Sequence, residues 1–323
     1  MKKSLFIQYV LKYFAPVISG IVEKVNGKTG QQRYYFKEMM GREYTPTLKW
    51  GSLTSNGRAV AADVVSMDSS LPLKKRDSIR LAEGDVPKLG MKMYLGEREL
   101  TDLNILQGTN QGGERDGAIL AKLFEDSKKC IIGVWEQLEG MFLEALSTGV
   151  TTIGGDTNTG TAIRIDFNHP DANKFGVQVP WGDASSLVID DIENVLSTAD
   201  AAGRTIRFLM MDRATFKNLR NLDQAKQTFA VSIGFTGTNI PTPNINQLNE
   251  AFNEEFGVEI VVVNRPVSYE KNGKTITKKP FASNTVVFLE DMKVGNLFWG
   301  TLAEKNHPAK QVTYADADEY ILV

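Results

Sequence analysis

The chain has 323 residues, of which 42% are hydrophobic, and its formal net charge is −2. This length exceeds that of one average domain and permits substantial hydrophobic cores. A single cysteine (Cys130) and two histidines (His169 and His307) exclude a disulfide framework, a zinc ribbon and a multi-histidine metal site.

The charge is divided unevenly along the chain. Residues 1–50 carry nine Lys or Arg and three Glu, a charge of +6. Residues 51–323 carry 28 Lys or Arg and 36 Asp or Glu, a charge of −8. A basic leading segment on an acidic body indicates an arm that pairs with an acidic partner.

The N-terminal segment has some features of a secretory signal, because Lys2 and Lys3 precede a long apolar run. Gln8 and Lys12 interrupt that run, and no Ala-x-Ala cleavage site follows it. No stretch of the chain reaches the roughly 18–20 uninterrupted apolar residues of a membrane helix. We therefore predict neither a secretory signal nor a membrane span.

Aromatic residues give the same segment an apolar surface. Phe6, Tyr9 and Phe14 lie within nine residues of one another. Such a segment is too apolar to be a free tail, so we expect it to lie against another surface.

A projecting hairpin is predicted after an irregular stretch at residues 34–53. Residues 60–73 read as an extended strand, and residues 91–100 alternate apolar and polar side chains again. The stretch between them would form a charged tip, whose basic residues are Lys74, Lys75, Arg76 and Arg80. The predicted hairpin covers residues 57–99. Because an isolated hairpin is marginal in water, we expect its partner to be another chain.

Residues 115–147 give the strongest periodic signal in the sequence. Apolar residues recur at steps of three and four, which places them on one stripe of an α-helix, and Gly149 supplies a stop. At about 1.5 Å per residue this helix would span about 50 Å. Such a length is typical of a scaffold element, unless Gly133 or Gly140 kinks the helix.

The second half of the chain alternates strands and helices. Hairpins are predicted at residues 150–167, around the turn-rich stretch 154–160, and at Asn272-Gly273. The other predicted elements are helices at 186–202, 212–222 (with Asp212 as N-cap) and 245–256, buried strands at 206–211 and 258–263, a loop at 230–243, and C-terminal strands at 285–289 and 319–323. This order predicts an α+β fold that contains a small α/β lobe.

Few residues are candidates for chemistry. Gly155 and Gly160 have the spacing of a P-loop, but Thr161-Ala162 stands where that motif needs Lys-Ser or Lys-Thr, which favours a hairpin turn. Cys130 lies among apolar residues of the predicted helix without a histidine nearby, as a small buried hydrophobe does.

The histidines and acidic groups give no clear site either. His169 and His307 both precede proline and have no Ser, Asp or metal partner nearby in sequence, which is typical of turn residues. The acidic groups at 190–191 and 316–319 lack the spacing of an EF-hand calcium loop. We predict no catalytic residue, no cofactor and no metal. The basic tip lacks interleaved aromatic residues, which favours a protein contact over nucleic acid.

Taken in order, the elements resemble the HK97-type fold of tailed-bacteriophage major capsid proteins, and more closely the lambda-type major capsid protein family. SYEKNGKTITKKPFASNTVVFLE (268–290) is similar to that family's hairpin and strand before the last segment. YADADEYILV (314–323) is similar to its terminal Asp-Pro-Asp-Glu-Phe stretch, with Ala317 in place of the proline. Residues 190–221 are similar to it in their order of helix, strand and Asp-x-x-x-Phe helix.

The resemblance implies a capsid subunit that self-assembles into the hexamers and pentamers of an icosahedral phage capsid enclosing double-stranded DNA. Scaffolding, portal and decoration proteins would be further partners, without cofactor, enzymatic activity or membrane contact. The subunit would lie in the host cytoplasm during assembly and then in the virion capsid. Its implied parts are an N-terminal arm (1–55), an E-loop hairpin (56–100), a peripheral domain (101–188 and 266–323) with a spine helix (115–147), and an axial domain (189–265).

Contacts between subunits are expected from the arm and from the hairpin tip. The candidate contact residues are Lys74, Lys75, Arg76, Arg80, Phe6, Tyr9 and Phe14. Two alternatives stay open. One is an encapsulin-like nanocompartment shell, which shares the fold but encloses cargo enzymes, and the other is a metabolic enzyme that uses the α/β lobe around Asp212 and the 230–243 loop.

Overall fold

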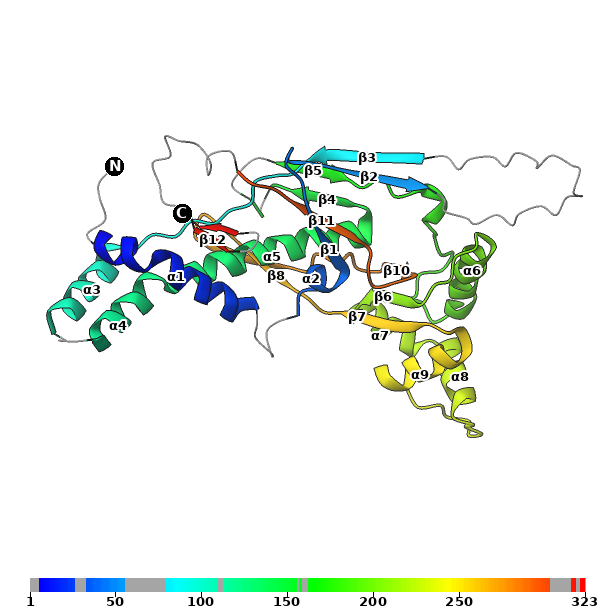
Figure 1. Ribbon diagram of the computed structural model, residues 1–323. Helices are drawn as coiled ribbons and strands as arrows, with labels where there is room; N and C mark the ends of the chain where they lie inside the picture. The colour runs from blue at the N-terminus through cyan, green and yellow to red at the C-terminus, as the bar shows by residue number, and fades with distance from the viewer. Residues whose placement is uncertain are drawn as a thin grey trace, which may run out of the picture.

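The computed structural model describes residues 6–26, 33–55, 79–109, 113–155, 157–158, 162–302, 315–317 and 320–322. These residues form an elongated molecule of mixed helices and small sheets, which confirms the predicted α+β class (Figure 1). The helices are α1 (Ile7–Asn26), α2 (Tyr35–Met39), α3 (Glu97–Thr109), α4 (Gly113–Leu123), α5 (Glu125–Thr148), α6 (Val188–Ala201), α7 (Arg213–Asn221), α8 (Asp223–Ser232) and α9 (Ile245–Phe256), with a 3₁₀ turn at Asp171–Asn173. The strands are β1 (Met40–Tyr44), β2 (Lys49–Ser55), β3 (Ile79–Asp85), β4 (Val150–Ile153), β5 (Ile163–Asp166), β6 (Phe208–Asp212), β7 (Glu259–Val263), β8 (Val267–Lys271), β9 (Lys274–Lys278), β10 (Val286–Leu289), β11 (Gly295–Trp299), β12 (Ala315–Ala317) and β13 (Tyr320–Leu322).

Helix α5 runs along the middle of the molecule and organises the larger core (Figure 1). Its apolar stripe buries Ile131, Trp135 and Leu143, against which α1 and α2 pack. Residues distant in sequence, such as Val263 and Phe281, complete this core. The helix therefore forms the central scaffold of this core, as its apolar periodicity predicts.

The predicted helix over residues 115–147 consists of two helices, α4 and α5, which meet at Phe124. This residue has φ −104° and ψ 7°, and its buried ring lies 6.2 Å from the ring of Phe14. An acidic first turn at Glu125 and Asp126 then starts α5, where a helix N-terminus favours negative charge. The prediction of one continuous helix is therefore wrong, and the break lies at neither predicted glycine.

Gly149 ends α5 in the left-handed conformation, with φ 78°, and its N–H donates to the carbonyl of Ala145 at 2.8 Å. A Cβ at this position would lie 3.0 Å from Cγ and Nδ1 of His169. This arrangement explains why glycine is needed at the end of the helix.

Gly149→Ala is expected to lower the free energy of unfolding by about 1–2 kcal/mol, because alanine is strained at a positive φ and would crowd the imidazole. Gly20→Ala is the matched control, since Gly20 lies within α1 with open space around it. That variant should be neutral or stabilising by about 0.5–1 kcal/mol. Urea unfolding compares the two, and equal effects would contradict the strain argument.

The far end of the molecule is a lobe with its own core. Strand β6 lies between β7, which is parallel to it, and β10, which is antiparallel. Helices α6 to α9 cover this sheet and bury a cluster that includes Leu209, Leu248 and Phe252. Asp212 caps α7 as predicted, since its Oδ1 accepts a hydrogen bond from the N–H of Thr215 at 2.8 Å. The lobe matches the predicted α/β pattern, except that α8 was not predicted: it occupies residues 223–229, which were left unassigned, and residues 230–232, where the predicted loop at 230–243 is wrong.

Two antiparallel strands, β2 and β3, are present in this region, but they are shifted from those predicted. Strand β2 pairs with β3 from Lys49↔Asp85 to Ser55↔Ile79, whereas the predicted strand at 60–73 lies outside the described residues. Residues 91–100 are not a strand, because residues 86–96 are irregular and α3 begins at Glu97. Met91 lies over Gly133 of α5, but Met91 and Met93 both remain exposed, so the alternation of this stretch does not mark a buried face.

Non-local pairing also gives structure to residues 34–53, which were predicted to be irregular. Strand β1 pairs in parallel with β11, from Met40↔Gly295 to Tyr44↔Trp299. The rings of Tyr44 and Trp299 meet edge to face at 5.0 Å. A partner about 255 positions away cannot be seen in the local pattern, which explains the wrong prediction.

Candidate assembly surfaces and the network behind them

A buried carboxylate joins the N-terminal segment to the long helix. Glu139 of α5 is fully buried, and its two oxygens accept hydrogen bonds from the N–H groups of Tyr35 at 3.0 Å and Phe36 at 3.1 Å. These are the first N–H groups of α2, whose N-cap residue provides no side-chain cap. Glu139 therefore caps α2 from another helix.

Burial raises the pKa of Glu139, and the two N–H donors only partly offset this effect. A carboxyl group without these donors would be costly at this position. Its place in the fold therefore depends on α2 being docked on α5.

One turn earlier on α5, Glu136 connects two further segments. It accepts hydrogen bonds from the Tyr34 hydroxyl at 2.8 Å and from Nη2 of Arg265 at 2.6 Å. The Arg265 guanidinium lies over the Tyr34 ring at 4.9 Å and also donates to the carbonyl of Pro266. Burial and the hydrogen bond to Glu136 raise the pKa of the Tyr34 hydroxyl.

Together these groups form what we call the carboxylate network: Tyr34, Glu136, Glu139 and Arg265, with the N–H groups of Tyr35 and Phe36. Arg265 lies between β7, the last strand of the lobe, and β8. We call this connecting segment, residues 264–266, the lobe's exit. The network joins the lobe's exit to α5 and to the N-terminal segment. Sequence reasoning missed it. The available signal was Glu139 itself, a charged residue on the apolar stripe between Trp135 and Phe142.

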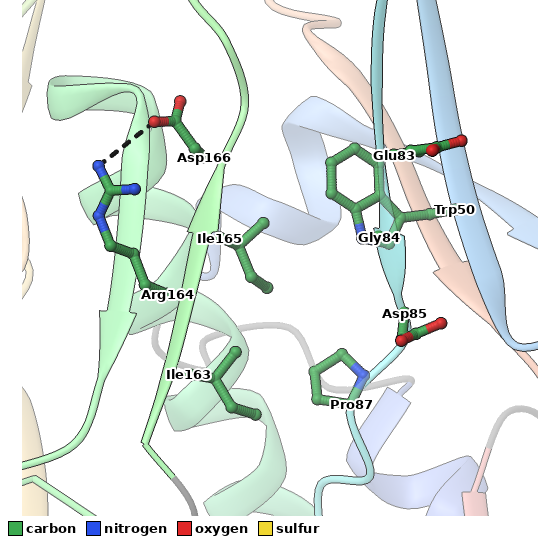
Figure 2. A pocket seen from close by; sticks show the side chains of 9 residues that line it. All are labelled: Trp50, Glu83, Gly84, Asp85, Pro87, Ile163, Arg164, Ile165 and Asp166. Carbon is green, nitrogen blue, oxygen red and sulfur yellow. Dashed lines mark hydrogen bonds and ion pairs between the residues drawn. The ribbon is translucent and has the colours of Figure 1, made fainter.

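An open cleft of about 480 Å³, lined by both apolar and charged residues, lies between strands β2 and β3 on one side and strand β5 on the other (Figure 2). The Trp50 ring and Pro87 face the side chains of Ile163 and Ile165 across it. Trp50 lies over Gly84 on the paired strand, where a Cβ would be 2.8 Å from Nε1 of the indole. Glycine at this position therefore makes room for the indole that lines the cleft.

Charged residues surround this cleft at its rim. Glu83 and Asp85 alternate with Gly84 on β3, and Arg164 and Asp166 alternate with the isoleucines on β5, pointing away from the centre (Figure 2). Asp166 accepts from the N–H of Asn168 at 2.9 Å, which holds the pKa of this carboxyl below its usual range. Three carboxylates and one guanidinium leave the rim with a net charge of −2.

A second surface with apolar character lies at the outer end of the lobe. Val231, Ile233, Phe235 and Ile245 flank the segment that joins α8 to α9, and all are exposed, Val231 by 76%. We call these four residues the lobe patch. Exposed apolar side chains that lie close together in the chain are candidates for an interaction surface.

The structure places the predicted contact residues of the arm within the chain. Phe6 is buried beside Leu103 and Ile119, and Tyr9 donates a hydrogen bond to Asp116 at 3.2 Å. Phe14 is partly buried against the core around α5. The arm thus lies against another surface, here the same chain.

Residues Lys74, Lys75 and Arg76 of the hairpin tip lie outside the described residues. Arg80 lies in β3, opposite Thr54 of β2. The inter-subunit role of these residues stays a prediction.

The candidates for chemistry do not come together. Burial raises the pKa of the Cys130 thiol, and His169 packs against the end of α5, while His307 lies outside the described residues. In the part of the chain that the structure describes, no three His, Cys, Asp or Glu side chains are grouped as a metal site. No helix among the described residues is long and apolar enough to cross a bilayer.

Comparison with known proteins gives one family and several distant structures. Residues 21–317 match the family model described as phage major capsid protein E. The similar structures include a candidate capsid protein of a prophage in E. coli CFT073, at 14% identity and a TM-score of 0.41, covering 84% of this chain and 70% of that one. They also include a phage-related protein from Bordetella bronchiseptica RB50, at 11% identity and a TM-score of 0.42, covering 84% and 74%. The search of curated proteins gives no significant match.

Proposed function

Because the chain belongs to the phage major capsid protein E family and is a structural subunit of a phage capsid, we propose that its copies assemble into the hexamers and pentamers of an icosahedral shell around double-stranded DNA. The observation that carries this proposal is the family match over residues 21–317. It also favours a phage shell over the encapsulin-like compartment and over a metabolic enzyme.

The surfaces of the molecule support such assembly. A closed shell requires each subunit to present several different surfaces to its neighbours, which close by symmetry. The lobe patch and the cleft beside Trp50 are two separate candidates for such surfaces. Several modest interfaces per subunit make a shell far more stable than any one contact.

We also propose a division of the subunit into parts, as the resemblance implies. In this proposal residues 1–55 form the arm, 56–100 the E-loop, and 189–265 the axial domain with the lobe patch near the capsomer centre. Residues 101–188 and 266–323 form the peripheral domain of the HK97-type fold, with α5 in its spine. The remaining partners would be scaffolding, portal and decoration proteins, first in the host cytoplasm and then in the virion.

Negative-stain electron microscopy of the purified chain tests the proposal. We expect shells, tubes or capsomer rings as the concentration is raised, with or without a scaffolding protein. A folded chain that stays monomeric at high concentration under both conditions would contradict the proposal.

The lobe patch gives a specific prediction. The double variant Val231→Asp and Ile233→Asp is expected to keep the fold, because both side chains are exposed, and to reduce assembly at least about tenfold by placing charge in an apolar contact. Sedimentation velocity measures the assembled fraction. Leu187→Asp is the control, since Leu187 is an exposed apolar residue outside the patch. Equal assembly of the three proteins would remove the patch from the interface.

A further inference from the structure

Helix α2 is held in place by groups that lie outside it. The helix has five residues, and isolated helices shorter than about 12–15 residues are marginal in water. Its N-cap residue, Tyr34, provides no side-chain cap, and the N–H groups of Tyr35 and Phe36 donate to Glu139 of α5. Together with the burial of Phe36 and Met39 in the core around α5, this contact keeps the segment in its helical conformation.

One cation from the lobe's exit acts on both carboxylates of the network. Glu136 and Glu139 are three positions apart on α5, where side chains of a helix are neighbours and like charges repel. Burial is the main cause of the raised pKa of Glu139, and the charge of Glu136 adds to the rise, whereas Arg265 opposes it. Arg265 therefore stabilises the charged form of the group that caps α2, although its own hydrogen bonds go to Glu136 and to the carbonyl of Pro266.

Tyr34 connects the same arginine directly to the start of α2. Its hydroxyl donates to the oxygen of Glu136 that also accepts from Arg265, and the guanidinium lies over its ring at 4.9 Å. Without this guanidinium, two largely buried carboxylates would lie side by side beneath Tyr34 and α2. Such charges are stabilised by water when a cation is lost, and displacement of Tyr34 and α2 would admit that water.

We propose that the carboxylate network couples the lobe's exit to α2, so that displacement of Arg265 from α5 releases residues 34–39. The inference goes beyond the proposed function, because it concerns a conformational change within a single subunit. In one state α2 is docked and Arg265 binds Glu136, and in the other α2 is released and both carboxylates are hydrated. Because a coupling between two sites is reciprocal, release of α2 must also loosen the lobe's exit.

Hydrogen–deuterium exchange of the full-length, dissociated subunit tests the coupling. Labelling times of seconds to minutes report local opening, to which unfolding of the whole chain contributes little. Arg265→Met is expected to raise the exchange rate of residues 34–39 at least about tenfold relative to the wild type. Helix α6 in the lobe should keep its protection. Unchanged exchange of residues 34–39 would overturn the proposal.

Two control variants separate this effect from a general loss of stability. Leu248→Ala removes a fully buried side chain from the lobe core and destabilises the chain without touching the network. Arg204→Met removes the same residue type from the exposed pair with Glu290. Residues 34–39 should exchange in both controls as in the wild type. Equal exchange of these residues in Arg265→Met and Leu248→Ala would show that lower stability alone loosens α2, and would overturn the coupling.

The reciprocal measurement uses Glu139→Ala, in which the hydrogen bonds that are removed go to α2. Release of α2 in this variant is expected to raise the exchange rate of residues 264–268 at least about threefold. A variant that releases α2 and leaves these residues as protected as in the wild type would show that the two sites are independent.

Arg265→Lys replaces Arg265→Met if the methionine variant does not fold. Lysine keeps the positive charge but lacks the planar fork that lets arginine donate to Glu136 and to the carbonyl of Pro266 at the same time. We expect the same pattern, with faster exchange at residues 34–39 and a protected α6, at about threefold or more. Wild-type exchange at residues 34–39 in this variant would contradict the proposal.

Discussion

Glu139→Ala is expected to lower the free energy of unfolding of the dissociated subunit by about 2–4 kcal/mol. The substitution removes the acceptor of two buried N–H groups, those of Tyr35 and Phe36, and each unsatisfied group costs about 1–3 kcal/mol. It also leaves α2 without its cap. Urea unfolding followed by circular dichroism measures the loss, and a loss below about 0.5 kcal/mol would contradict the capping role.

Glu139→Gln separates the hydrogen bonds from the charge. Glutamine keeps one acceptor oxygen, so Glu139→Gln should lower the free energy of unfolding by less than Glu139→Ala does. Burial raises the pKa of Glu139 in the folded chain above its ordinary value of 4.5. At a pH between the ordinary and the raised pKa, Glu139 is therefore protonated more often in the folded chain than in the unfolded chain. This contribution to stability is therefore present at acidic pH and is lost as the pH rises through the raised pKa.

The pH dependence gives a readout that a purely steric effect would not produce. The wild type should lose stability relative to Glu139→Gln as the pH rises from about the ordinary pKa of Glu toward neutrality. A constant difference between the two proteins over this range would show that Glu139 does not titrate as its burial predicts.

Much of the fold could be predicted because its elements are locally encoded. Helix α9 begins and ends where the sequence indicates, since Asn244 and Gln247 form a capping box and Gly257 adopts φ 68° after it. The turn at Asn272-Gly273 has positive φ at both residues, as a two-residue hairpin requires. Such features depend on neighbours only a few positions away.

The elements that were missed depend on distant partners. Strand β1 needs β11, and Phe124, at the break between α4 and α5, packs against Phe14. The alternation at 91–100 resembled a strand, but these residues pair with no other strand among the described residues, and Met91 lies over α5 instead. In each case tertiary contacts decide the structure, and a local pattern does not contain them.

The candidate surfaces show the same division. Aromatic residues predicted that the arm lies against another surface, but the sequence did not show that this surface belongs to the same chain. The contact role of the hairpin tip stays a prediction. The cleft beside Trp50 combines this residue with Ile163 and Ile165, more than 100 positions later in the chain, and the carboxylate network combines Tyr34 with Arg265. Only the residue types, such as a glutamate on an apolar stripe, were visible beforehand.

Arg265→Met is expected to lower the free energy of unfolding by about 3–5 kcal/mol, because it leaves Glu136 as a largely buried charge without its cation. Glu136→Leu leaves the guanidinium unpaired in the same way, with an Arg265 side chain that is only 5% exposed. The double variant removes both charges, so its cost should be well below the sum of the two single costs. The difference is the coupling energy of the pair.

The pair formed by Arg204 and Glu290 is the matched control, since it joins the same residue types at 2.7 Å with side chains that are 44% and 45% exposed. Its coupling energy should not exceed about 1 kcal/mol, because water screens the charges and already solvates each partner. The pair in the carboxylate network should exceed this value by at least about 1 kcal/mol. Equal coupling energies for the Arg265–Glu136 and Arg204–Glu290 pairs would mean that the buried pair does not hold the lobe's exit to α5. The apolar core around Trp135 and Val263 would then have to hold the two together alone.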